Sequence, residues 1–145
     1  MKKKVYVGLA TDILHEGHID ILNHAAKLGD VTVGLLTDKA IASYKDIPHY
    51  NYENRKLLLN NFKQISNIIP QESLDYKENL ELLKPDYVVH GDDWKTGIQK
   101  KTRQIVIKTL KKWSGKLIEI KYKKDIPHKS IYKIFEKGAS PDIRR

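Results

Sequence analysis

The N-terminal part of the chain reads Lys4-Val-Tyr-Val-Gly-Leu-Ala-Thr-Asp-Ile-Leu-His-Glu-Gly-His18. It begins as a short apolar run, which is the pattern of a buried strand, and it continues into a polar turn. A segment with apolar residues at helical spacing follows, from Gly17 to Leu28, and Gly29 closes that segment. This order predicts a strand, a polar turn and a helix, which together form the first unit of a parallel sheet.

The rest of the chain repeats this alternation. Further strands are predicted at 30–36, 65–69, 87–90 and 116–122, and further helices at 52–62, 75–84, 98–113 and 130–137. The pattern predicts an α/β fold with a five-stranded parallel sheet and helices on both faces. Ligands bind beyond the carboxyl ends of the strands in such sheets, so functional residues are expected in the polar segments 10–18, 37–45, 91–94 and 123–130.

Composition narrows the class of protein. The chain has 145 residues, 40% hydrophobic and 31% charged, which predicts one globular domain. It lacks cysteine, which excludes disulfides, thiolate metal sites and cysteine nucleophiles. No apolar run approaches the roughly 18 residues that cross a bilayer or forms the core of a signal peptide, so we expect a cytoplasmic protein without a membrane partner.

The charge is strongly positive and unevenly distributed. The net charge is +9, and residues 95–145 carry sixteen of the 27 lysines and arginines against four acids. This balance suits an anionic partner such as a nucleotide, a phosphorylated metabolite or nucleic acid, and it also suits a solvated lysine-rich surface. Charge alone leaves both interpretations open.

Two histidines flank a glycine immediately before the first predicted helix. The N-terminus of a helix presents unpaired N–H groups that favour phosphate, and Gly17 lets the backbone approach a ligand closely. His15 and His18 could donate hydrogen bonds to phosphate oxygens. Two alternatives remain: a pair of surface histidines, or a metal pair, although further ligands at a usable spacing are not evident.

The same segment resembles a known signature. Residues Val7 to His18 resemble the G-x-F-D-x-x-H-x-G-H signature of HxGH nucleotidyltransferases. Tyr52-Glu-Asn-Arg-Lys56 and His90-Gly-Asp-Asp-Trp94 resemble the Tyr-x-x-Arg helix and the Gly-Asp-Asp-Trp loop of glycerol-3-phosphate cytidylyltransferases. The resemblance covers about residues 4 to 125 and implies a Rossmann-like nucleotidyltransferase fold, CTP as a substrate, Mg²⁺ as a cofactor and a homodimer.

A closer resemblance is to the cytidylyltransferase domains that are fused to phosphoenolpyruvate mutase. It is carried by segments 30–45, 83–95 and 99–103, and the tail 138–145 resembles the linker to the mutase. It implies that residues 1–137 form the cytidylyltransferase domain and that a mutase domain can belong to the same polypeptide. The acceptor would then be 2-aminoethylphosphonate or 2-hydroxyethylphosphonate.

Three other functions compete with this expectation. The acceptor could be a phosphate ester, glycerol 3-phosphate or phosphocholine. The chain could be a non-catalytic nucleotide-binding module, or a basic nucleic-acid-binding domain, although we expect only weak and unspecific binding to nucleic acid.

The resemblance also implies roles for individual residues. Those predicted to stabilise the reacting phosphates are His15, His18, Lys45 and Arg55. Those predicted to contact the nucleotide are Gly8, Leu9, Ala10, Thr11, Asp12, Gly17, His90, Gly91, Asp93, His128, Lys129 and Ser130. Asp12 is also a candidate for the metal shell. Asp92, Trp94 and Tyr52 are predicted to contact the acceptor, Asp92 by pairing an ammonium group and Trp94 by a cation–π contact.

One segment departs from the family pattern. Cytidylyltransferases usually carry Ile-Ser-Ser/Thr-Thr before the last helix, whereas this chain has Ile126-Pro-His-Lys-Ser130. Two hydroxyl-bearing positions have become Pro127 and His128. This change predicts either an impaired phosphate site or a different acceptor, with His128, Lys129 and Ser130 as the remaining donors.

Overall fold

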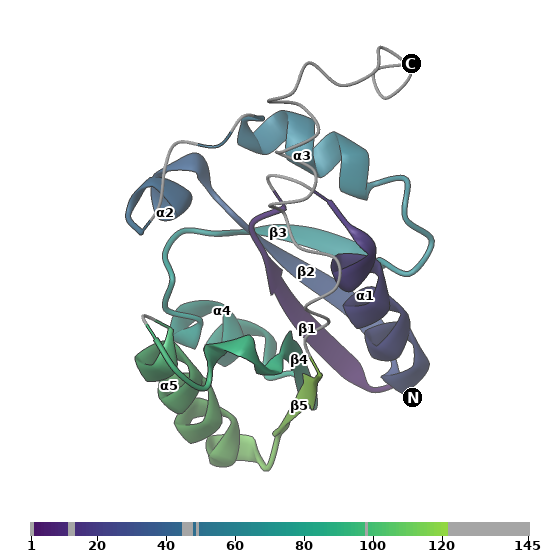
Figure 1. Ribbon diagram of the computed structural model, residues 1–145. Coiled ribbons are helices and arrows are strands. Elements are labelled where there is room, and N and C mark those ends of the chain that lie inside the picture. Colours follow the sequence, from purple (N-terminus) through teal and green to yellow (C-terminus); the bar gives the residue numbers. More distant parts are fainter. Residues whose placement is uncertain (1, 12–13, 45–47, 49, 98, 122–145) are drawn as a thin grey trace.

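The computed structural model describes residues 2–11, 14–44, 48, 50–97 and 99–121 of the chain. In these residues five strands form one parallel sheet in the order β3-β2-β1-β4-β5 (Figure 1). The strands are β1 (Lys4–Leu9), β2 (Asp30–Leu36), β3 (Asn67–Gln71), β4 (Tyr87–Gly91) and β5 (Lys116–Ile120). The predicted α/β class and parallel sheet are therefore confirmed.

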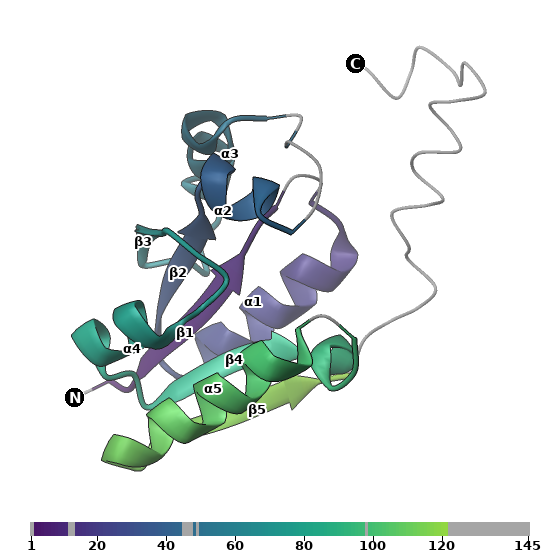
Figure 2. The ribbon, with the colours of Figure 1, turned by 90° about the vertical axis from the view of Figure 1, so that its left-hand side faces the viewer.

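Helices cover both faces of the sheet, as predicted. They are α1 (Glu16–Leu28), α2 (Asp38–Ala42), α3 (Tyr52–Leu59), α4 (Lys77–Leu83) and α5 (Lys100–Leu110), with 3₁₀ turns η1 (Asp92–Trp94) and η2 (Lys111–Trp113). Figure 2 shows α1 behind the strands and α5 in front of them. Among the described helices, none combines the length and the apolarity that crossing a bilayer requires.

The alternation of side chains along the strands gives each face its own core. On one face Val5, Val7 and Leu9 of β1 pack with apolar residues of α1 and α3. On the other face Tyr6 of β1 packs with residues of α4, η1 and α5 and of the turn before α4, which are Tyr76, Leu80, Trp94, Val106 and Leu110. The two cores fix the helices on either side of β1, and so they fix the positions of the loops at its carboxyl end.

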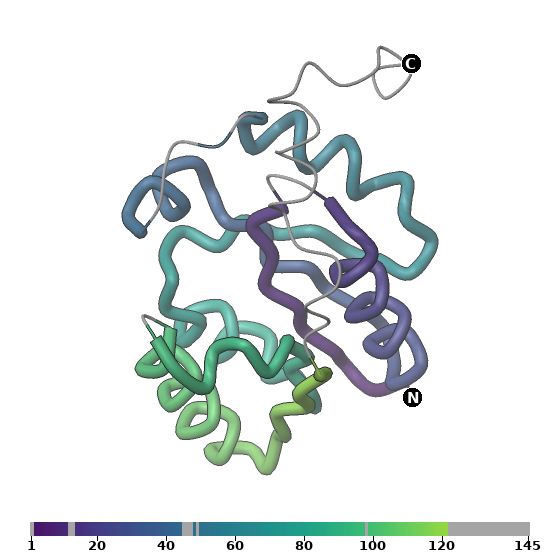
Figure 3. Tube along the Cα trace, in the orientation of Figure 1, coloured from purple at the N-terminus to yellow at the C-terminus, as the bar shows by residue number. Residues whose placement is uncertain are grey.

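The strand order creates the expected ligand position. The chain runs from β1 outward through β2 to β3, and it then returns to the other side of β1 for β4 and β5 (Figure 3). The connections that leave β1 and β4 therefore diverge in opposite directions at the carboxyl edge. This divergence leaves a crevice, and ligands of doubly wound sheets bind in such a crevice.

Two glycines in the middle of the sheet make room for tyrosine hydroxyls. Gly8 of β1 lies opposite Gly34 of β2 in the strand register. A Cβ atom at Gly34 would collide with the hydroxyl of Tyr6, and a Cβ atom at Gly8 would lie 2.6 Å from Cζ of Tyr76. A side chain at either position would displace a tyrosine from the core.

Several predicted element ends differ from the observed ones. The helix predicted at 75–84 begins at Lys77, because Asp75 Oδ1 accepts a hydrogen bond from the Lys77 N–H at 2.8 Å and so precedes the helix. The helix predicted at 98–113 ends its α-helical part at Leu110 and tightens into η2. The predicted helix 130–137 and the tail 138–145 lie outside the described residues.

Candidate active site

The helix α1 begins with a reciprocal pair of histidine caps. His15 precedes the helix in an extended conformation, and its Nδ1 accepts a hydrogen bond from the Gly17 N–H at 3.0 Å. Nδ1 of His18 in turn accepts from the His15 N–H at 3.2 Å. The two rings lie with their centroids 4.1 Å apart. The two imidazoles thus accept hydrogen bonds from backbone N–H groups, as the serine and glutamate side chains of an ordinary capping box do.

These caps determine which ring atom faces a ligand. An Nδ1 that accepts a hydrogen bond carries no proton, so a neutral ring must carry its proton on Nε2. His15 and His18 therefore present two Nε2–H donors beside the N-terminus of a thirteen-residue helix, which itself favours anions. The arrangement suits the oxygens of a phosphate group.

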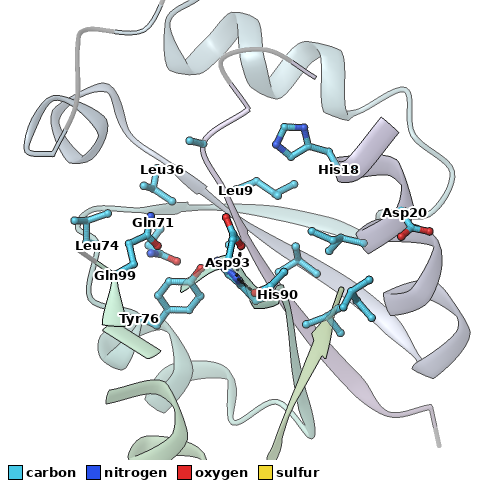
Figure 4. A pocket seen from close by; sticks show the side chains of 18 of the residues that line it. Leu9, His18, Asp20, Leu36, Gln71, Leu74, Tyr76, His90, Asp93 and Gln99 are labelled. Carbon is cyan, nitrogen blue, oxygen red and sulfur yellow. Dashed lines mark hydrogen bonds and ion pairs between the residues drawn. The ribbon is translucent and has the colours of Figure 1, made fainter. Parts of the chain in front are cut away.

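A cavity of about 210 Å³ opens at the carboxyl edge of the sheet, next to these histidines (Figure 4). Its lining contains residues of the strands and the turns that follow them. Of the residues predicted from sequence, it brings together Gly8, Leu9, Ala10, His15, Gly17, His18, His90, Gly91 and Asp93. Residues that are far apart in the sequence thus meet at one cavity.

Arg55 is not among the described residues that line this cavity, and its predicted contact with phosphate oxygens stays a prediction. The residue is 1% exposed, and within the described part of the chain its guanidinium makes four hydrogen bonds to protein acceptors. Nη1 donates to the carbonyls of Ala10 at 2.7 Å and Leu36 at 2.8 Å. Nε donates to the carbonyl of Tyr50 at 2.9 Å, and Nη2 to Asp38 Oδ1 at 2.7 Å. Arg55 therefore ties together the segments that follow β1 and β2 and precede α3.

Trp94 lies in the core, and its predicted contact with the acceptor stays a prediction. It is 1% exposed, and its ring stacks on His90 with centroids 3.6 Å apart and a 5° angle between the planes. Its Nε1–H donates to Glu119 Oε2 at 2.9 Å. His90 covers one face of the Trp94 ring, so that face is not available to a cation. Trp94 also borders a small recess, which is lined in addition by Tyr44, Asp93, Thr96 and Gln99.

His90 carries its ring proton on Nδ1, whereas neutral rings of His15 and His18 carry it on Nε2. Its Nδ1 lies 2.7 Å from the carbonyl oxygen of Gly91, and a carbonyl can only accept, so Nδ1 carries the proton. Burial lowers the pKa of His90, although Gly91, Asp93 and Glu119 oppose that shift. The ring is thus held neutral, with Nε2 as an acceptor at the cavity.

Three other predicted residues lie outside the cavity lining that the described residues form. Tyr52 packs beside the apolar core between α1 and the sheet, with its ring centroid 5.9 Å from the guanidinium carbon of Arg55. Thr11 is 4% exposed and donates from Oγ1 to the Ala10 carbonyl at 2.8 Å. Asp92 begins η1, and it is its neighbour Asp93 that lines the cavity. Tyr52 and Asp92 were predicted as acceptor contacts, and the structure does not place them there.

Some predicted residues cannot be located. Asp12, Lys45, His128, Lys129 and Ser130 lie outside the described residues, so their predicted roles stay predictions.

The cavity also contains residues that the sequence analysis missed. Its far end, away from the histidines, is lined by Tyr44, Gln71, Leu74, Tyr76 and Gln99. Gln71 ends β3, and Tyr76 directly precedes α4. The signal that could have found them is the sheet itself, because residues after β3 reach the same carboxyl edge as those after β1.

Comparison with known proteins identifies the family of the chain. Residues 8–134 match the model of the cytidylyltransferase-like family. The glycerol-3-phosphate cytidylyltransferase of Bacillus spizizenii is 35% identical over 97 residues, which cover 66% of this chain and 74% of that protein. The ethanolamine-phosphate cytidylyltransferase of Dictyostelium discoideum is 35% identical over 122 residues, 81% of this chain but 32% of that longer protein.

A solved structure agrees in fold. The lipopolysaccharide core biosynthesis protein from Thermoplasma volcanium has a TM-score of 0.71 and 26% sequence identity, and the match covers 83% of this chain and 98% of that one. The family match includes the end of the strand β1 from Gly8, the histidine-capped turn and the segment after β4, which are parts that form the cavity. With its parallel sheet and its paired histidines, the chain belongs to the cytidylyltransferase-like family of nucleotidyltransferases.

Proposed function

We propose that the chain transfers CMP from CTP to a small phosphate or phosphonate monoester and releases pyrophosphate. The observation that carries the proposal is the N-terminus of α1 with its reciprocal histidine caps, because His15 and His18 both line the cavity. A helix N-terminus with two imidazole donors suits the transferred phosphate better than any uncharged ligand.

The chemistry requires little from the protein beyond position and charge. An oxygen of the acceptor attacks the α-phosphorus of CTP, and the new P–O bond forms as the bond to the bridging oxygen breaks. That oxygen takes the electron pair and leaves in pyrophosphate. Because the attacking oxygen is already anionic, a general base is not required, and catalysis depends on alignment and on hydrogen bonds to the phosphate oxygens.

His15 and His18 supply those hydrogen bonds. A donor aimed at charge that develops in the transition state typically contributes about 3–4 kcal/mol to lowering the barrier. Arg55 acts indirectly, because its bonds to Ala10 and Leu36 hold the turn after β1 against the end of β2. Lys45 is retained as a predicted contact to phosphate.

The donor set fits a magnesium ion that is held mainly by the substrate. The cavity lining includes the carboxylates of Asp20 and Asp93. Across the described ranges there is no cluster of three or more histidine or acidic side chains that could hold a metal ion. Mg²⁺ in nucleotide sites keeps several waters and binds phosphate oxygens, where it neutralises charge. Asp12 stays the predicted protein contribution to its shell.

The acceptor is best sought first among phosphate esters. The relatives named above are cytidylyltransferases for glycerol 3-phosphate and for ethanolamine phosphate. The phosphonates 2-aminoethylphosphonate and 2-hydroxyethylphosphonate follow from the resemblance to mutase-fused domains, and they stay predictions.

The test is release of pyrophosphate from CTP and Mg²⁺ with each acceptor in turn: glycerol 3-phosphate, ethanolamine phosphate, phosphocholine and the two phosphonates. We expect release that depends on the acceptor and that falls when ATP replaces CTP. Tight binding of CTP without release from any acceptor would instead support a non-catalytic nucleotide-binding module.

A further inference from the structure

Tyr76, directly before α4, lines the cavity. The residue is 4% exposed, and its ring lies edge-on to Tyr6 and tilted against Trp94, each with centroids 5.8 Å apart. These contacts fix the ring. Figure 4 shows its hydroxyl directed away from the core, towards Asp93 and the middle of the cavity.

The Tyr76 hydroxyl differs from its buried neighbour in having no partner among the described residues. The hydroxyl of Tyr6 donates to Gln71 Oε1 at 2.6 Å and accepts from Asn79 Nδ2 at 3.0 Å. Fully buried side-chain nitrogen and oxygen atoms of the described part of the chain all have hydrogen-bond partners. The Tyr76 hydroxyl is therefore the polar end of a buried residue that opens to the cavity, where water or a ligand can bond it.

Its position and its charge state are both constrained. Gly8 leaves the space in which the hydroxyl lies, over the carboxyl end of β1. Burial raises the pKa of Tyr76 well above its usual value, and the charges of Tyr6, Tyr44 and Asp93 add to that shift. The hydroxyl thus keeps its proton at physiological pH and can donate it. Asp93, which lines the same part of the cavity, can only accept when ionised.

The location indicates which substrate reaches this end. The cavity extends from the histidines to Ile120 and Lys121 on one side, and to Gln71, Leu74 and Tyr76 on the other. The ring centroid of Tyr76 lies 5.8 Å from that of Trp94, which is one of the residues predicted to contact the acceptor. The end at Tyr76 is therefore assigned to the smaller substrate, the acceptor.

We propose that Tyr76 and Asp93 together bind a hydroxyl group at the end of the acceptor that is distant from its phosphate or phosphonate. A ligand hydroxyl accepts from Tyr76 and donates to Asp93, so both protein groups are satisfied. An alkyl end leaves both unpaired, and an ammonium bonds Asp93 but has no lone pair for the Tyr76 donor. The inference rests on the proposed function. It replaces the expected pairing of an ammonium with Asp92, and it gives Asp93 a role towards the acceptor in place of its predicted contact with the nucleotide.

The experiment compares three acceptors that differ at one end: 2-hydroxyethyl phosphate, ethanolamine phosphate and ethyl phosphate. For the wild-type chain we expect kcat/KM to be roughly 10–100-fold higher for the hydroxyl compound than for ethyl phosphate, because a site built around a hydroxyl rejects analogues that lack it. The Tyr76→Phe variant removes one oxygen and keeps the ring. It should lose about tenfold or more with 2-hydroxyethyl phosphate, mainly in KM, and change little with ethyl phosphate or in KM for CTP.

Tyr6→Phe is the matched control. It removes a buried hydroxyl that bonds Gln71 and Asn79 instead of facing the cavity, so it should lower Tm without changing the ratio between acceptors.

The outcomes separate this inference from the function on which it rests. Absence of pyrophosphate from the wild-type chain with every acceptor overturns the proposed function and the inference with it. Turnover with a preference for the amine or for ethyl phosphate overturns the inference alone, and this comparison needs no variant. An equal loss with all three acceptors in Tyr76→Phe, or a changed KM for CTP, would also overturn it.

Discussion

At the scale of single residues, His15 combines two functions that a substitution can separate. Its Nδ1 caps α1, and the residue also lines the cavity, where a proton on Nε2 is proposed to bond phosphate. Asparagine caps helices well but has no donor at the position of Nε2. We expect His15→Asn to keep Tm close to that of the wild type while kcat falls by about 10²–10³-fold. His15→Ala should lose the same activity and also about 1 kcal/mol of stability.

Pyrophosphate release and thermal unfolding, measured on the same preparations, check this prediction. His24→Ala is the control, because His24 belongs to the same helix, is half-exposed and bonds the carbonyl of Asp20. Normal kcat in the His15→Asn variant would show that only the cap matters.

Arg55 illustrates what a sequence cannot reveal about a residue. A lone cation in a polar region suggests a contact to an anionic substrate. Its four partners come from three separate segments of the chain, and their convergence depends on the fold. The position of the histidines, by contrast, was predictable, because a glycine and a helix start are local features.

We expect Arg55→Lys to destabilise the chain by about 3 kcal/mol or more, because an ammonium cannot match the planar set of hydrogen bonds and leaves buried carbonyls unpaired. Urea unfolding measures this loss, with Lys56→Ala, the next residue on α3, as the control. A stable Arg55→Lys variant whose only defect is a raised KM would support the prediction of a direct phosphate contact.

At the scale of elements, Glu119 joins β5 to α5 and η1. Its carboxylate accepts from Nε and Nη2 of Arg103, both at 2.9 Å, and from Trp94. The hydrogen bond from Arg103 is the largest cause that lowers the pKa of Glu119, and Trp94 and Lys95 contribute. The unfolded chain therefore takes up this proton at a higher pH than the folded chain does.

It follows that the stabilisation by Glu119 is present above its ordinary pKa of 4.5 and is lost as the pH falls through the lowered folded value. We expect Glu119→Gln to be less stable than the wild type at pH 7, and the difference to shrink as the pH falls below 4.5. Denaturant unfolding across this range measures it, with Glu78→Gln as an exposed control. A difference that is independent of pH would contradict the role of the charge.

The sequence predicted helices and strands well where the periodic pattern of apolar residues is long, and poorly where that pattern is short. The helix α2, of five residues, was hidden in a polar segment, although Thr37 caps it by accepting from the Ala40 N–H at 3.1 Å. The strand β3 lies later in the sequence than predicted, and it includes Pro70. A proline is tolerated there because β3 is at the edge of the sheet, and its place in the sheet was not deducible locally.

At the scale of the whole molecule, the alternation of strands and helices predicted the fold class, but not which strand lies next to which. The return of β4 to the far side of β1 is what brings His90 and Asp93 to the histidines of α1. This explains why the nucleotide side of the site was largely predicted from motifs, while the end at Tyr76 was not. The expected homodimer stays a prediction.

A ligand that binds the folded chain should stabilise all of it. With CTP at about one hundred times its Kd and Mg²⁺ present, we expect the free energy of unfolding to rise by about 2.7 kcal/mol. That corresponds to an increase in Tm of roughly 5–10 °C for a chain of this size. Thermal shift assays with and without Mg²⁺ measure it. An oligonucleotide that stabilises the chain more than CTP does, with a steep loss in salt, would favour the nucleic-acid interpretation.

The paired glycines of the sheet have a consequence for the history of the sequence. Gly8 accommodates the hydroxyl of Tyr76, as Gly34 accommodates that of Tyr6. A substitution that adds a side chain at position 8 is then tolerated only in a background that has already lost the tyrosine at position 76. The two positions should therefore covary among descendants of a common ancestor, and a lineage that changes its acceptor is expected to pass through a smaller residue at position 76 before it replaces Gly8.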